Sequence, residues 1–211
     1  MTVNWMKPRC WPAIAICLLV AGCGGGGKGS TAGPVGGAGQ GSSATAAAGA
    51  GVPSEAQSAA TGDIPDNQAF LTFADGPAGY SIRYPEGWTR RGAAGDVTFQ
   101  DRANVIHVTV ASGPPPTPAD ASSAIAALRR TDPTIKGGGP QRVTINGSPV
   151  IKVTYTRLSA ADPVTAKRLP LTIDRYEYAH GGKTAIVDLG TPQGVDNVDA
   201  YKMISRSFRW H

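Results

Sequence analysis

Cysteine is scarce in this chain of 211 residues, which contains only Cys10, Cys17 and Cys23, all close to the N-terminus. The rest of the chain has no thiol, so it can form no disulfide, no thiolate metal site and no cysteine nucleophile. A domain built from those residues must be held together by its hydrophobic core alone.

Long apolar runs and excess charge are also missing. No stretch of 18 or more apolar residues exists, which excludes a polytopic membrane protein. Charged residues make up 17% of the chain and the formal net charge is +5. This small excess argues against a nucleic-acid-binding protein.

The chain also lacks recognisable catalytic motifs. It has no Gly-x-Ser-x-Gly element of the kind that carries a serine nucleophile. Its three histidines, His107, His180 and His211, form no His-x-x-x-His pair, and no Asp-rich calcium loop is present. The sequence therefore predicts neither an enzyme nor a metal site, and we expect His107 to be a strand residue that is either hydrogen-bonded or half-exposed.

The N-terminus has the pattern of an export signal. Lys7 and Arg9 precede an apolar stretch at residues 11–21, about the length of a secretory core region. Translation from Met6 would keep both cations before the same stretch. The sequence leaves the choice between Met1 and Met6 open.

The next residues, Leu19-Val-Ala-Gly-Cys23, resemble the lipobox of bacterial lipoproteins. The resemblance implies cleavage between Gly22 and Cys23 and a diacylglyceryl group on Cys23, with no other cofactor. Two acyl chains hold a protein durably to a bilayer. We expect an anchored protein on the extracytoplasmic face of the cell membrane, with membrane lipid as its first partner. The alternatives are an ordinary secretory signal with an incidental cysteine, and an outer rather than a cytoplasmic membrane.

Composition divides the remaining chain in two. Residues 24–62 are almost entirely small, with nothing large and apolar to bury, so we expect a disordered spacer. All four Phe, all six Tyr and two of the four Trp lie beyond Asp66. We predict a signal peptide at 1–22, a lipidated cysteine with its tether at 23–65, and one globular domain at 66–211.

The first half of that domain alternates like strands and then turns helical. We expect strands at 70–73, 79–84, 96–100 and 104–112. A helix should follow, with Thr117 as N-cap, Pro118 at its first position and Asp120 completing a capping box. Ile125 and Leu128 would face the sheet, and Asp132-Pro133 would end the helix.

The second half repeats this order. Asn146-Gly147 predicts a type I′ hairpin between strands at 142–145 and 150–156. A second hairpin joins 169–179 to 184–189. A closing helix from Asp196 should bury one stripe, made of Val198, Tyr201, Ile204 and Phe208.

This order of elements predicts an α+β fold, an α-β-α sandwich with an antiparallel sheet flanked by two helices. The segments Gly79–Trp88, Gly95–Asp101 and Ile204–Trp210 resemble the PsbP-like superfamily, in particular the LpqN-type lipoproteins of actinobacteria. The resemblance implies the same sandwich. It also implies a binding or assembly factor rather than an enzyme, and it transfers no functional residue.

Charged side chains form several candidate groups. Arg175 and Glu177 share a face of one strand, which predicts a solvated ion pair. Asp174 points to the opposite face, and Asp188 on the partner strand can join either side. Three pairs of cations occur, at 90–91, 167–168 and 206/209. They are either dispersed surface charge or a patch that faces anionic lipids or wall polymers.

Two hypotheses for the function follow. The first is a non-catalytic adaptor for an envelope protein or complex. The second is a carrier or sensor that holds a small apolar ligand between sheet and helix, with four tyrosines as candidate lining residues: Tyr155, Tyr176, Tyr178 and Tyr201. A deep apolar pocket would favour the carrier and an exposed surface patch the adaptor.

Overall fold

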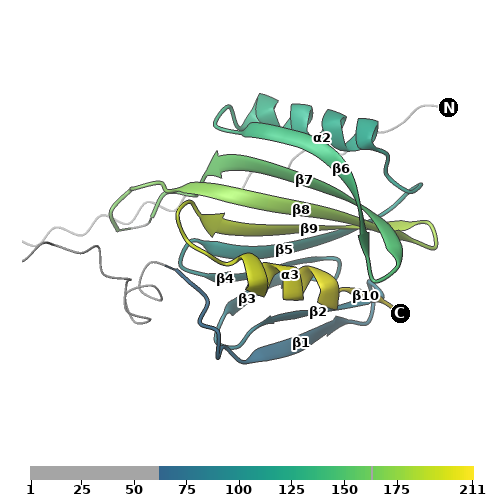
Figure 1. Cartoon of the computed structure of the whole chain (residues 1–211), viewed down its shortest axis with the longest axis horizontal. Helices are drawn as coiled ribbons and strands as arrows, with labels where there is room; N and C mark the ends of the chain where they lie inside the picture. The colour runs from purple at the N-terminus through teal and green to yellow at the C-terminus, as the bar shows by residue number, and fades with distance from the viewer. Residues whose placement is uncertain (1–61, 163) are drawn as a thin grey trace, which may run out of the picture. The chain divides into compact units, whose positions relative to one another are not determined.

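The computed structural model describes residues 62–162 and 164–211, all within the unit of the chain that spans residues 49–211 (Figure 1). The predicted signal peptide, Cys23 and most of the predicted tether lie outside these residues. Among the residues described, no helix is long and apolar enough to cross a membrane.

A seven-stranded antiparallel sheet forms the centre of the fold, in the order β3-β4-β5-β9-β8-β7-β6 (Figure 1). Its strands are β3 (Thr89–Ala93), β4 (Asp96–Asp101), β5 (Asn104–Ser112), β6 (Lys136–Ile145), β7 (Ser148–Leu158), β8 (Pro170–His180) and β9 (Lys183–Pro192). Each neighbouring pair is antiparallel, and most are joined by short turns.

A second, smaller sheet has the order β1-β2-β10, with β1 at Phe70–Asp75, β2 at Tyr80–Pro85 and β10 at Arg209–Trp210. The α+β class and the flanking helices are confirmed, but the strands divide into two sheets where one was expected. The reason is the pairing of β10 with β2, because Arg209 lies opposite Ser81 although the two are far apart in sequence.

Helix α2 (Pro118–Thr131) packs on β6 and β7 and begins as predicted. The Asp120 amide donates to Thr117 Oγ1 at 3.2 Å, and the Thr117 amide donates to the Asp120 carboxylate at 2.9 Å. This is the capping box, and it holds the pKa of Asp120 below its ordinary value. Ile125 is buried beneath the helix and Leu128 packs against the same cluster.

The predicted turn between β6 and β7 is confirmed. Asn146 and Gly147 both have positive φ, 51° and 80°, as a type I′ turn requires. Strand β6 begins at Lys136, six residues before the predicted start. A bulge between Gly137 and Pro140 breaks the alternation there, so periodicity could not show the strand.

Helix α3 (Val198–Ser207) starts two residues later than predicted, after Asn197. Tyr201, Ile204 and Phe208 are buried, as expected of the stripe. Val198 was wrongly placed on it, since its side chain is 70% exposed. The reason is that Val198 borders a cavity instead of the core.

Two hydrophobic clusters fill the two faces of the large sheet. The larger lies toward α3 and the small sheet, where the Phe208 ring stacks on Tyr80 and Tyr178 at centroid distances of 5.5 and 4.5 Å. The smaller lies beneath α2 and includes Ile125 and Val153. Both clusters consist of described residues, so this part of the chain carries its own core and is expected to fold alone.

Two buried asparagines fix the point where the chain joins the domain. Asn197 Oδ1 accepts from the Ile64 amide at 2.7 Å, and Asn104 Nδ2 donates to the Gly62 carbonyl at 2.5 Å. Asn197 Nδ2 also donates to Asn104 Oδ1 at 3.1 Å. Contacts with the domain are therefore made by Gly62 and Ile64, ahead of the predicted start at Asp66.

Candidate functional site

The four candidate tyrosines do not share one site. Tyr176, Tyr178 and Tyr201 lie on the α3 side of the large sheet, whereas Tyr155 lies on the opposite side, in the cluster beneath α2. Tyr178 is part of the packed core, because its hydroxyl donates to the Ser205 carbonyl at 2.7 Å. Only Tyr176 and Tyr201 border a cavity.

This cavity, which we call the helix pocket, lies between the start of α3 and strands β7, β8 and β9. Its volume is about 360 Å³. Leu189 and Val195 contribute apolar groups to the wall. Polar groups come from the strands and from α3. The Tyr201 hydroxyl donates to the Gly190 carbonyl in the sheet, and burial raises the pKa of this hydroxyl far above its ordinary value. Tyr201 is therefore a neutral wall of the pocket.

A charged pair lines the same pocket. Lys152 Nζ lies 2.9 Å from an Asp174 carboxylate oxygen and 5.3 Å from the centre of the Tyr176 ring. Burial lowers the pKa of Lys152, but the hydrogen bond and charge of Asp174 outweigh this effect and raise it above its ordinary value. The pocket thus presents a fixed ion pair and an aromatic face to any occupant.

A second hollow, which we call the basic groove, lies between α3, strands β1 and β2, and the β6–β7 turn. It has a volume of about 590 Å³ and is open to solvent. Four cations line it, Arg83, Lys202, Arg206 and Arg209, against one acid, Asp199. Within the described residues, none of these four cations forms an ion pair.

The backbone holds this groove in shape. Asn146 Nδ2, at the turn, donates to the Arg206 carbonyl at 2.8 Å, and Arg209 Nη1 donates to the same oxygen at 2.6 Å. The Arg83 amide donates to Ser207 Oγ at 2.9 Å. The hairpin, the helix end and strand β2 are therefore fixed relative to one another, with the cationic side chains projecting from a rigid frame.

The Arg175, Asp188 and Glu177 group forms on the α2 side of the sheet, but as a buried cluster rather than the solvated pair that was expected. Two guanidinium nitrogens of Arg175 lie 2.7 Å from the two Asp188 carboxylate oxygens. The Arg175 side chain is buried, and the Tyr155 ring covers it, with 5.8 Å between the guanidinium carbon and the ring centre. Burial raises the pKa of Tyr155 to about 12.

His107 is hydrogen-bonded, as predicted. Its Nε2 lies 2.8 Å from an Asp96 carboxylate oxygen, and both side chains are substantially exposed. No group of three or more His, Cys, Asp and Glu side chains able to hold a metal ion occurs in the part of the chain that the structure describes. The lipidation and cleavage residues, Cys23 and Gly22, lie outside that part and stay predictions.

No family model matches this chain, and no curated protein matches it in sequence. Comparison with solved structures does find similar proteins. Cyanobacterial PsbP (CyanoP) from Synechocystis sp. PCC 6803 is 19% identical, with a TM-score of 0.49, over 68% of this chain and 94% of that one.

Two further neighbours have related shapes. LpqN of Mycobacterium tuberculosis, which is involved in cell envelope biogenesis, is 13% identical with a TM-score of 0.42, over 68% of this chain and 91% of that one. The Saccharomyces cerevisiae Ran-binding protein Mog1p is 8% identical with a TM-score of 0.45, over 68% and 96%. Likeness at this level concerns the fold and transfers no partner.

Sequence reasoning missed the residues that shape both hollows. Lys152 and Asp174 lie on neighbouring strands, and the alternation of a strand does not show that α3 leaves them at the wall of a cavity. The basic groove joins Arg83 to Arg206 through the packing of α3 on β2. The cationic run at the end of the chain was a signal for it, but its partner Arg83 required the tertiary structure.

Proposed function

We propose that this chain is a lipid-anchored, non-catalytic binding module on the extracytoplasmic face of the cell membrane, and that it docks on an envelope protein. The anchor rests on the lipobox at Leu19–Cys23 and the preceding apolar stretch. The small-residue tether would give the domain a reach of roughly 35 Å from the lipid surface. The observation that carries the docking role is the basic groove.

The groove fits an acidic segment of a partner protein. Its four cations face one acid and have no ion-pair partner within the described residues. Unpaired cations in a concave surface attract an anionic partner and speed its association. Hydrogen bonds of Asn146 and Ser207 already hold the groove in shape. Binding of a segment would therefore cost little free energy for ordering the groove.

The anchor is tested by fractionating host cells that express the full chain. We expect the protein in the membrane fraction, and Cys23→Ala in the soluble extracytoplasmic fraction or retained as the uncleaved precursor. Cys17→Ala, which changes a cysteine in the same leader, is the matched control and should stay in the membrane fraction with a diacylated N-terminus by mass spectrometry. Unchanged processing of Cys23→Ala would refute the anchor.

Docking is tested by in-cell cross-linking of the anchored chain, followed by purification and mass spectrometry. We expect one envelope protein, recovered in near-equal amount and cross-linked to groove residues through an acidic segment. The double variant Lys202→Glu/Arg206→Glu should lose it. The control variant Arg91→Glu/Lys136→Glu reverses two exposed cations on β3 and β6, the edge strands of the large sheet. It should still recover the partner. Equal recovery with both variants would exclude the groove.

The helix pocket supports a second candidate function, a carrier or sensor of a small ligand with an aromatic or apolar body. Its supporting observation is the cavity of about 360 Å³ bounded by Tyr176 and Tyr201 between sheet and helix. This volume lies within the range of small-molecule sites. The Lys152–Asp174 pair would orient a polar group on such a ligand.

Native mass spectrometry of the domain purified from its host tests this candidate. We expect an additional mass that disappears in Val195→Trp, which places an indole at the pocket wall. Asn67→Trp, a change at an exposed position outside the pocket, is the control and should keep the mass. A bare chain mass from several growth conditions would exclude the carrier.

A further inference from the structure

A third hollow lies on the other side of the large sheet, away from the basic groove and the helix pocket. It has a volume of about 530 Å³. It is located where the β4–β5 turn, the ends of β7 and β8, and the β7–β8 connection meet. We call it the sheet-end pocket. Its main apolar lining residues are Val105, Leu171 and Ile173.

The floor of the sheet-end pocket is a continuous apolar surface. Val105, Gly190 and Ile173 lie side by side on β5, β9 and β8. A Cβ atom on Gly190 would lie 2.6 Å from Val105 Cγ1 and 2.7 Å from Ile173 Cδ1. Because glycine has no side chain, its two neighbours close over it, and no polar group of β9 interrupts the floor.

Cations stand around this floor. Arg102, Arg157 and Lys167 line the rim, against Asp162 as the single acid. The Asp162 carboxylate accepts hydrogen bonds from the Val164 amide at 3.0 Å and the Thr165 amide at 2.7 Å, so it is engaged in its own turn. Together with Asp132, which pairs with Arg157 from outside the lining, two acids face the three cations, so the rim keeps a small excess of positive charge.

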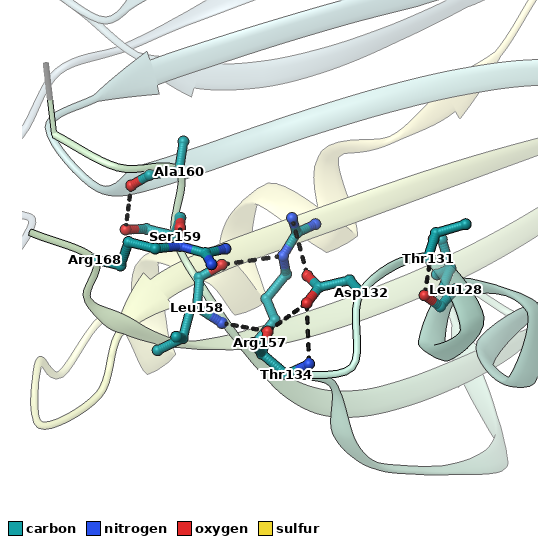
Figure 2. A network of polar contacts seen from close by, with 9 residues as sticks. All are labelled: Leu128, Thr131, Asp132, Thr134, Arg157, Leu158, Ser159, Ala160 and Arg168. Atoms are coloured by element: carbon teal, nitrogen blue, oxygen red, sulfur yellow. Dashed lines mark hydrogen bonds and ion pairs between the residues drawn. The ribbon is translucent and has the colours of Figure 1, made fainter. Parts of the chain in front are cut away.

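Arg157 is held in place at the rim (Figure 2). Its Nη2 lies 3.4 Å from the Asp132 carboxylate, and its Nε donates to the Leu158 carbonyl at 3.4 Å. Asp132 is itself fixed by hydrogen bonds from the amide and hydroxyl of Thr134, at 3.0 and 2.5 Å. Beside it, Arg168 Nε donates to the Ser159 carbonyl and secures the pocket wall.

From this arrangement we propose that the sheet-end pocket binds a long-chain carboxylate, a fatty acid. The alkyl chain lies on the floor of Val105, Leu171 and Ile173, where removal of its methylene groups from water is favourable. The carboxylate meets Arg157 and Lys167 at the rim. The volume lies within the usual range for small-molecule sites. The inference uses only described residues and does not depend on the lipid anchor or on the basic groove.

The combination of groups selects this ligand class. A purely apolar ligand would make no use of Lys167 at the rim, and a small anion such as acetate would leave the floor exposed to water. A carboxylate accepts hydrogen bonds from guanidinium and ammonium groups with charge assistance. A fatty acid has one charged end and one apolar chain. These two parts match the cationic rim and the apolar floor of the sheet-end pocket.

The test is isothermal titration of residues 49–211, which contain the complete core, with dodecanoate below its micelle concentration. We expect one molecule bound per chain, at least about tenfold weaker binding of dodecanol, and no binding of acetate. In methyl-labelled protein, the NMR signals of Val105, Leu171 and Ile173 should shift. Equal affinity for dodecanol and dodecanoate would overturn the role of the rim.

Two charge variants complete the test. Lys167→Glu should weaken dodecanoate binding by about fivefold or more, because an attraction becomes a repulsion. Lys136→Glu, an exposed cation on β6, should leave it unchanged. Both residues are exposed, and far-ultraviolet circular dichroism checks that the fold is kept. No binding by the wild type, or methyl shifts at the helix pocket instead, would overturn the proposal.

Discussion

At the scale of single residues, Glu177 is the acid that this fold tolerates least. It is only 5% exposed on β8, and no hydrogen bond to its carboxylate is found among the described residues. Burial raises the pKa of Glu177, Arg175 lowers it, and the carboxylates of Asp188 and Asp120 raise it further. The net direction is upward, so the pKa of Glu177 is higher in the folded chain than in the unfolded chain.

This difference makes stability depend on pH. Because the pKa of Glu177 is higher in the folded than in the unfolded chain, its contribution is fully present below the unfolded value and is lost as pH rises through the folded value. We expect Glu177→Gln to raise the melting temperature at pH 7, with the difference shrinking toward pH 4. Thermal unfolding across this range measures it, and the exposed Glu86→Gln should show no such trend. A pH-independent difference would contradict the idea.

Gly190 is required by the packing of its neighbours. An added methyl group would clash with Val105 and Ile173, and overpacking of this kind costs about 1–3 kcal/mol. We expect Gly190→Ala to lower the melting temperature by about 2–4 °C for each kcal/mol lost. Gly113→Ala, where nothing lies within 4 Å of the new Cβ, is the control and should unfold like the wild type. Equal stability of the two variants would show that the floor can relax.

Residue patterns gave the faces of the sheet but not their exposure. Alternation correctly placed Arg175 and Glu177 on one face, yet predicted that they would be solvated, and it left the side of Asp188 open. Tyr155 on β7 lies against Arg175 and helps to cover it. A sequence shows which side of a strand a residue occupies, whereas the layers that cover that side come from distant parts of the chain.

At the scale of elements, α2 owes its start to its capping box. Thr117 accepts the Asp120 amide, and loss of an N-cap side chain costs about 1 kcal/mol. We expect Thr117→Ala to destabilise the domain by about that amount in urea denaturation. Ser123→Ala, an exposed change in the same helix, should be neutral or slightly stabilising because alanine favours helices. A smaller loss at Thr117 than at Ser123 would contradict the role of the cap.

Elements with local signals were predictable, and those without were not. The α2 cap and the Asn146-Gly147 turn were identified because their chemistry lies within a few residues. The edge strand β3, with every residue exposed, has no buried face and hence no alternation to detect. Strand β10 has two residues and exists because β2 is beside it.

At the scale of the whole molecule, the candidate sites depend on how the two sheets and two helices come together. The basic groove needs α3 against β2, the helix pocket needs α3 against β8 and β9, and the sheet-end pocket needs α2 to leave part of its face uncovered. The sequence supplied the anchor motif and two of the tyrosines at one pocket. The hollows themselves could not be predicted, since each joins segments 50 or more residues apart.

Aromatic side chains link the two sheets, and Phe208 is the one that stacks on a ring of each sheet. Phe208 is 4% exposed and lies between Tyr80 of the small sheet and Tyr178 of the large one, stacked on both. We expect Phe208→Ala to cost about 3–5 kcal/mol, the usual loss for a buried phenylalanine. Phe70→Ala, a half-buried ring at the edge of the small sheet, is the control and should cost less.

Urea unfolding followed by tryptophan fluorescence and by far-ultraviolet circular dichroism measures both the loss and its cooperativity. In Phe208→Ala the two signals should still change together, at a lower urea concentration, because α3 and the cluster around Ile82 and Val187 continue to join the sheets. Two separated transitions would instead show that the small sheet unfolds alone once Phe208 is removed. The basic groove, which spans that junction, would then be lost before the rest of the domain.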